Sequence, residues 1–161
     1  MDNWNTQMGN KPIIGWREWA AFPDLGVDQI NAKIDTGART TGARTSAIHA
    51  FRIREESIDG IPYVSFRLHP IQRRKTPDIF CSVPIADKRL VTSSNGQKQN
   101  RIVIKTPMTL GARTWPIELT LTDRDEMTFR LLIGREALRN RFLIDASGSH
   151  RLGQIAPSEE D

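Results

Sequence analysis

One aspartate in this sequence, Asp35, is well placed for catalysis. From Gln29 to Ile34 apolar and polar residues alternate, which predicts a strand with one buried face. Asp35 follows that strand directly, and Thr36-Gly37 begins a turn rich in small residues. A carboxylate on a tight turn between two core strands is held in position and only partly hydrated. That placement suits acid–base chemistry.

A second motif, late in the chain, strengthens this reading. Asp35-Thr36-Gly37 resembles the signature of aspartic proteases, although so short a match arises often by chance. Retroviral-type aspartic proteases also carry a short apolar run followed by Gly and by an Arg that opens a helix. The stretch Leu131 to Arg135 fits that pattern, and the two motifs occur in the order found in those proteases.

The longer match is to one bacterial retropepsin-like family, whose members are often labelled ATP-dependent zinc proteases. The stretches similar to that family are Ala32 to Ala50, Ser94 to Gly96, Trp115 to Leu121 and Gly134 to Asp145. One departure concerns the active-site loop. The family runs from Asp-Thr-Gly-Ala-Arg-Thr directly into Ser-Ala-Leu-His, whereas here Thr36–Thr40 is repeated as Thr41–Thr45.

A single Asp-Thr-Gly supplies only one carboxylate. Aspartic peptide hydrolysis needs two, about 3 Å apart and sharing one proton. We therefore expect a symmetric homodimer in which Asp35 from each chain meets its copy at the axis. The resemblance assigns the active-site loop to Thr36, Gly37 and Ala38, the supporting positions to Ile133, Gly134 and Arg135, and the substrate-covering flap to Ser94, Asn95 and Gly96. Arg135 could equally be a first-turn helix residue with its charge in water, and the flap a plain exposed turn.

The repeated pentapeptide leaves two functions open. If the second copy bulges outward, the chain is an aspartic-type endopeptidase. By the resemblance its substrates are acidic, glutamate-rich peptides, because family members are often encoded beside ATP-grasp ligases that add glutamates to a ribosomal protein. If the copy displaces the carboxylate, the chain is a non-catalytic β-barrel binding module for a ribosome or an acidic peptide.

Composition and charge limit the other possibilities. The 161 residues are 38% hydrophobic and 26% charged, as expected of one soluble domain. The net charge of +4 would suit an acidic peptide, and no nucleic-acid-binding signature is present. Cys81, the only cysteine, is expected in the core. With no secretion signal, no membrane-length apolar run and no possible internal disulfide, we expect a cytoplasmic protein.

The sequence calls for no cofactor and no metal. His49, His69 and His150 are far apart and lack chelate spacing, and no H-E-x-x-H motif occurs. A phosphate-binding G-x-x-x-x-G-K-[ST] motif is missing as well. A zinc site built from residues distant in the sequence remains open, but "zinc" and "ATP-dependent" are not features that these motifs encode.

The predicted fold is all-β, a closed barrel of the retroviral acid-protease kind with one short helix over Arg135 to Asn140. The expected domain covers residues 11–152, between a disordered tail at 1–10 and an acidic tail at 153–161. The strands expected from alternation and turn signals are Pro12 to Phe22, Val27 to Ile34, Ala47 to Arg54, Pro62 to His69, Ile79 to Ile85, Leu90 to Thr92, Arg101 to Thr106, Trp115 to Leu121, Met127 to Ile133 and Phe142 to Asp145.

Overall fold

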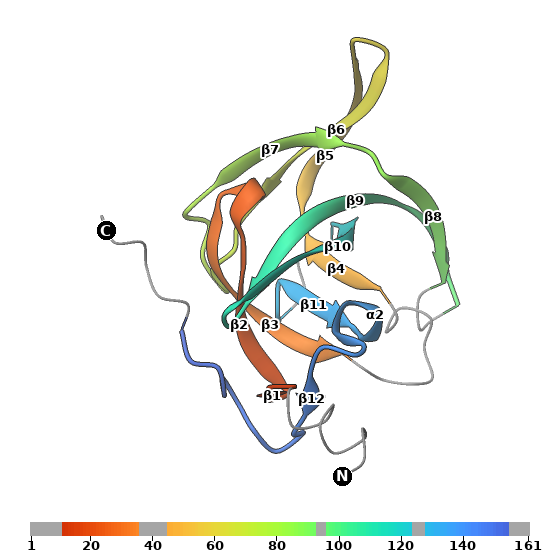
Figure 1. The fold of residues 1–161 in the computed structure, drawn as a ribbon. Coiled ribbons are helices and arrows are strands. Elements are labelled where there is room, and N and C mark those ends of the chain that lie inside the picture. Colours follow the sequence, from red (N-terminus) through yellow and green to blue (C-terminus); the bar gives the residue numbers. More distant parts are fainter. Residues whose placement is uncertain (1–10, 36–44, 93–95, 124–127, 155–161) are drawn as a thin grey trace.

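The computed structural model describes residues 11–35, 45–92, 96–123 and 128–154, and this part of the chain is mostly β-structure with one short α-helix (Figure 1). The elements are β1 (Ile13–Ile14), β2 (Arg17–Phe22), the 3₁₀ helix η1 (Pro23–Leu25), β3 (Val27–Asp35), β4 (Ser46–His49), β5 (Phe51–Ile58), β6 (Ile61–Leu68), β7 (Ile79–Pro84), β8 (Asp87–Thr92), β9 (Lys98–Leu110), β10 (Arg113–Thr122), β11 (Leu131–Gly134), α2 (Arg135–Leu138) and β12 (Leu143–Ile144). None of the helices described could cross a membrane.

The largest sheet brings together strands from both halves of the chain. Its order is β10-β4-β11-β3-β2-β9-β8, and β9 also pairs with β10. The pairings therefore run from β10 through β4, β11, β3, β2 and β9 back to β10. Such a circuit is what a closed barrel requires, but closure itself stays a prediction. In the middle of the sheet, β11 lies parallel to β3 and antiparallel to β4.

The alternation in β10 is confirmed by burial. Trp115, Ile117, Leu119 and Leu121 are between 0% and 6% exposed, whereas Pro116 and Glu118 are exposed. Thr120 and Thr122 were expected on the solvent face, but they are buried as well. Neighbouring structure therefore covers both faces of the second half of β10.

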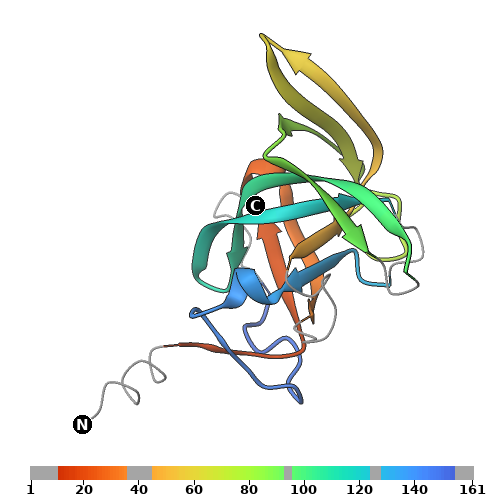
Figure 2. The same cartoon turned by 90° about the vertical axis from the view of Figure 1, so that its right-hand side faces the viewer.

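A second sheet, in the order β5-β6-β7, is built from local hairpins, and the β5–β6 hairpin extends away from the rest of the molecule (Figures 1 and 2). At its tip Asp59 and Gly60 have φ of 53° and 79°, the positive values that a type I′ turn requires at both central residues. The edge strand β7 carries Cys81 into the core at 5% exposure. Burial raises the pKa of the Cys81 thiol to about 11, so a core role fits this cysteine better than a nucleophilic one.

Several predicted boundaries were wrong because distant segments interrupt the strands. The strand expected from Pro12 to Phe22 breaks at Gly15-Trp16, since β1 pairs with β12 instead of continuing beside β3. The strand expected from Ala47 to Arg54 splits at Ala50 into β4 and β5, which belong to different sheets.

The elements at the carboxyl end are also shorter than expected. The structure limits β11 to Leu131–Gly134, α2 to Arg135–Leu138 and β12 to Leu143–Ile144. The expected tail 1–10 lies outside the described residues, as do residues 155–161 of the expected acidic tail.

The segment after β12 packs back against β2 around a buried carboxylate. Glu18 is 0% exposed and accepts hydrogen bonds from the backbone N–H groups of Gly15 (2.7 Å), Arg151 (2.8 Å) and Leu152 (3.1 Å). His150, the residue before Arg151, stacks on Trp19 with ring centroids 4.9 Å apart. We call this group of contacts around Glu18 and His150 the C-terminal clamp; it ties the end of the domain to its first long strand.

Candidate active site

Asp35 is the last residue of β3, and it is half-buried. In the parallel pairing of β3 with β11, its partner is Gly134. The backbone N–H of Gly134 also donates a hydrogen bond to Ser46 Oγ at 3.1 Å. Asp35 and Ser46 flank the repeated segment, so both ends of that segment are attached at one point, Gly134. Thr36, Gly37 and Ala38 lie outside the described residues.

The supporting residues expected from the resemblance meet at the same place. Ile133 is fully buried, and Gly134 is buried at the start of α2. Arg135 follows as the first residue of that helix and is half-buried. Its guanidinium forms no ion pair with any carboxylate in the described ranges. The structure thus brings Ile133 and Gly134 behind Asp35, while the capping role of Arg135 stays a prediction.

A serine and a threonine brace the site from the next strands. Thr120 Oγ1 donates to the backbone oxygen of Ser46 at 3.0 Å, and both residues are buried. This contact joins β10 to β4, whose residues Leu119 and Ser46 are also paired in register. Ser46 lay inside the matched motif but was not singled out. The hint in the sequence was a hydroxyl directly after the loop, at the start of an apolar strand.

The predicted flap is the hairpin of β8 and β9. Ser94 and Asn95, at its tip, lie outside the described residues, and Gly96 is exposed with a φ of 84°. The two strands are longer than expected, and they pair in register from Asp87 opposite Val103 to Thr92 opposite Lys98. The hairpin is therefore present, and its function as a substrate cover stays a prediction.

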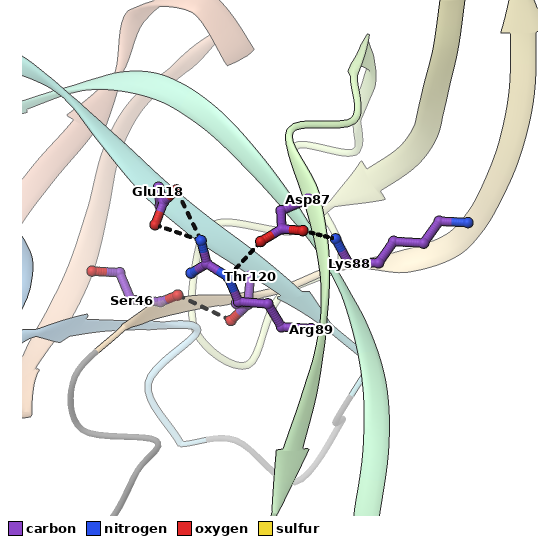
Figure 3. A network of polar contacts seen from close by, with 6 residues as sticks. All are labelled: Ser46, Asp87, Lys88, Arg89, Glu118 and Thr120. Carbon is purple, nitrogen blue, oxygen red and sulfur yellow. Dashed lines mark hydrogen bonds and ion pairs between the residues drawn. The ribbon is translucent and has the colours of Figure 1, made fainter.

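An ion-pair network at the base of this hairpin was not expected from the sequence. Arg89 Nε donates to Asp87 Oδ2 at 2.8 Å, and Arg89 Nη2 donates to both carboxylate oxygens of Glu118 at 2.9 and 3.0 Å (Figure 3). We call Asp87, Arg89 and Glu118 the flap-base network. The hydrogen bond from Arg89 contributes most to lowering the pKa of the Asp87 carboxyl, and the two carboxylates raise the pKa of Arg89.

Beside this network a cleft of about 230 Å³ lies between β4, β10 and α2. It is lined by Thr45, Ser46, Trp115, Pro116, Ile117, Glu118, Glu136, Ala137 and Arg141. The Trp115 indole N–H donates to the backbone oxygen of Ala137 at 3.1 Å, which fixes one wall to α2. The cleft thus begins at Thr45 and Ser46, beyond the predicted active-site loop, and extends along β10 from Trp115 to Glu118.

The histidines do not form a metal site in the part of the chain that is described. There, no three or more His, Cys, Asp or Glu side chains come together in a group that could hold a metal ion. The rings of His49 and His69 each lie near the ring of Phe51, with centroid distances of 6.3 and 4.4 Å. His150 belongs to the C-terminal clamp, where its Nε2 is 2.8 Å from Asn31 Oδ1.

Comparisons with known proteins agree on the domain and add a second protein class. The family described as "Retropepsin-like aspartic endopeptidase RimB" matches residues 13–152. A protein of Legionella pneumophila, Lpg0085, solved with unknown function, has a similar structure. Its TM-score is 0.68 and its identity 27%, and the match covers 88% of this chain and 98% of that one.

Two curated relatives carry a different kind of name. A protein of Shewanella pealeana is 48% identical over 145 residues, which is 90% of this chain and 31% of that protein. One from Desulfotalea psychrophila is 42% identical over 91% of this chain and 30% of its own length. Both are named "Probable alpha-L-glutamate ligase". The chain spans about a third of the length of these relatives.

Proposed function

Since this chain belongs to the RimB-like family of retropepsin-like aspartic endopeptidases, we propose that it is itself a homodimeric aspartic peptidase that uses Asp35 from each of two copies. The observation that carries this proposal is the attachment of both Asp35 and Ser46 at Gly134. The strand ends that hold the catalytic loop keep one common anchor despite the repeated pentapeptide. The pairing circuit of the large sheet supports the barrel that this mechanism needs.

In the proposed mechanism the two Asp35 carboxyl groups share one proton, since like charges about 3 Å apart do not both ionise. The ionised carboxylate accepts a proton from water while the water oxygen attacks the peptide carbonyl carbon. The protonated carboxyl donates its proton to the carbonyl oxygen. Collapse of the tetrahedral intermediate then breaks the C–N bond. The leaving amine takes the proton that the first carboxylate gained from water, and the second carboxylate accepts a proton from a hydroxyl of the intermediate as the C=O bond re-forms. One carboxyl must stay protonated and the other ionised, so activity should follow a bell-shaped pH profile.

The substrate class that we propose is acidic, glutamate-rich peptide. The net charge of +4 favours such a substrate. The relatives named as glutamate ligases contain the matched domain within a longer chain, which associates it with glutamate chemistry. Because this domain makes up only 30–31% of those proteins, their names describe chains that are mostly outside the match. Hydrolysis by this domain is therefore compatible with those names.

The test is hydrolysis of a glutamate-rich peptide by the wild type and by Asp35→Asn. The amide keeps the shape of the side chain but cannot act as the base, so we expect a loss of about 10³-fold or more with unchanged thermal unfolding. Sedimentation should show a dimer, and EDTA should leave the rate unchanged. Full activity of Asp35→Asn, or a strict monomer that hydrolyses peptide, would contradict the proposal.

A further inference from the structure

The guanidinium of Arg89 is held in place but not fully used. A guanidinium carries five N–H groups, and here Nε and Nη2 donate to Asp87 and Glu118. Nη1 has no hydrogen-bond partner among the described residues. The Arg89 side chain is still 32% exposed. Two of its three nitrogens therefore fix the orientation of the group, and the third remains available to a ligand.

Arg89 lies a short chain of contacts away from Asp35. Glu118 and Thr120 are two residues apart on β10 and share a face of that strand. Thr120 bonds Ser46, and Ser46 bonds Gly134, the register partner of Asp35. Figure 3 shows Arg89 reaching from β8 toward Glu118, beside the contact between Ser46 and Thr120. The free edge of Arg89 is thus near the active site and on a strand of the predicted flap.

A second arginine lies directly opposite. Arg101 of β9 is the register partner of Arg89, and directly paired residues of antiparallel strands share a face. Arg101 is half-buried. Two positive charges therefore occupy the same face of the flap hairpin. Like charges opposite each other are destabilising unless anions accompany them, which Asp87 and Glu118 do for Arg89.

We propose that Arg89 is a specificity-determining residue that binds a side-chain carboxylate of the substrate through Nη1, with Arg101 adding to the positive field. The inference rests on the proposed peptidase function and identifies where its acidic substrate is recognised. A planar guanidinium matches a carboxylate, and its preset orientation lowers the entropy cost of binding. The nearby Asp87 and Glu118 carboxylates repel any anion, and they repel a polyanionic phosphate backbone more strongly than a single carboxylate.

The experiment compares two peptides of the same length, one rich in glutamate and one with glutamine at the same positions. Wild type should prefer the glutamate peptide in kcat/KM. Arg89→Gln should lower that preference about 10-fold or more, mainly through KM, because a charge-assisted hydrogen bond to the substrate is lost. Arg89→Lys should retain part of the preference. The matched control is Lys88→Gln, since Lys88 lies on the other face of β8 and pairs with Glu55.

A merely structural role for Arg89 gives a different result. If the flap-base network only holds the hairpin to β10, Arg89→Gln should weaken hydrolysis of both peptides equally, and that outcome would overturn the inference. An unchanged preference in Arg89→Gln would overturn it too. Thermal unfolding of each variant shows whether the fold is intact, and Arg89→Lys serves as the second variant if Arg89→Gln is unstable.

Binding separates this inference from the proposed function. In an Asp35→Asn background the glutamate peptide is not consumed, and its affinity can be measured by calorimetry with and without Arg89→Gln. We expect about a 10-fold or greater loss of affinity for the glutamate peptide and little change for the glutamine peptide. If wild type hydrolyses neither peptide but this affinity difference is found, the peptidase proposal fails and the Arg89 subsite stands. If the Asp35→Asn protein binds neither peptide, the subsite is wrong.

Discussion

Glu18 and Asp35 are carboxylates on neighbouring strands, and their surroundings differ. Glu18 lies opposite Ala32, on the strand that ends at Asp35. Glu18 is fully buried and accepts three backbone N–H groups, whereas Asp35 is half-buried and accepts none from the described residues. A buried carboxylate whose oxygens accept hydrogen bonds from backbone N–H groups stabilises the fold. One that retains free lone pairs near the surface can exchange protons with water and substrate.

The largest stability effect should therefore come from the residue without a catalytic role. Glu18→Ala leaves three N–H groups of the C-terminal clamp without their acceptor, and each unsatisfied buried donor costs about 1–3 kcal/mol. We expect the free energy of unfolding to fall by about 3 kcal/mol or more, measured by urea denaturation. Glu56→Ala is the matched control, because Glu56 is exposed on β5, and it should change stability by less than about 0.5 kcal/mol. A loss of kcat in folded Glu18→Ala, with stability unchanged, would reverse the comparison.

A smaller loss should come from the close backbone contact inside the clamp. A Cβ at Gly15 would lie 2.2 Å from the backbone oxygen of Gly148, so Gly15→Ala forces one of two backbone segments to move. We expect a loss of about 1–3 kcal/mol in unfolding free energy. Gly148→Ala is the matched control. Its Cβ would meet Arg151 Cδ at 2.7 Å, and that flexible side chain can move away. Equal losses in the two variants would show that the backbone contact is not the constraint.

The clamp also predicts a modest dependence of stability on pH. Burial, followed by the charge of Arg17, lowers the pKa of His150 from its ordinary 6.5, with Glu18 acting in the other direction. The folded state thus favours neutral His150. Its contribution is fully present above about pH 6.5 and is lost as the pH falls through the lowered folded-state pKa. Urea denaturation at pH 8 and pH 5.5 should show lower stability at pH 5.5. The decrease should be smaller in His150→Gln, and an equal decrease in the variant would refute this origin.

The same two carboxylates show what sequence could and could not predict. The family could be predicted because two separated motifs, each weak alone, occur together and in order, and Asp35 lies in the first of them. The buried apolar residues of β10, from Trp115 to Leu121, followed from alternation, which is a local property. Glu18 gave no such signal, because a charged residue in a strand usually faces water and two of its three partners lie more than 130 residues away. The same holds for Arg89 and Glu118, which are 29 residues apart and lie on two strands that β9 separates.

The smallest effect concerns the repeated pentapeptide beside Asp35. Deleting Thr41–Thr45 shortens the segment between Asp35 and Ser46 from ten residues to five, the length in the family pattern. Halving a loop changes the closure free energy by only about 0.6 kcal/mol, so unfolding should become harder by about that amount. Because Asp35 and Ser46 are both attached at Gly134, we expect the carboxylate to stay in place and the rate of peptide hydrolysis to change by no more than a few-fold.

The measurement is kcat/KM of the deletion variant beside Asp35→Asn in the same background, which must remain inactive. A different result would show that the repeat moves Asp35 out of position: a nearly inactive wild type whose rate rises about 100-fold on deletion. A displacement of about 1 Å can cause an effect of that size. The natural chain would then be the binding module of the alternative hypothesis, and Asp35 would have no catalytic role, like Glu18.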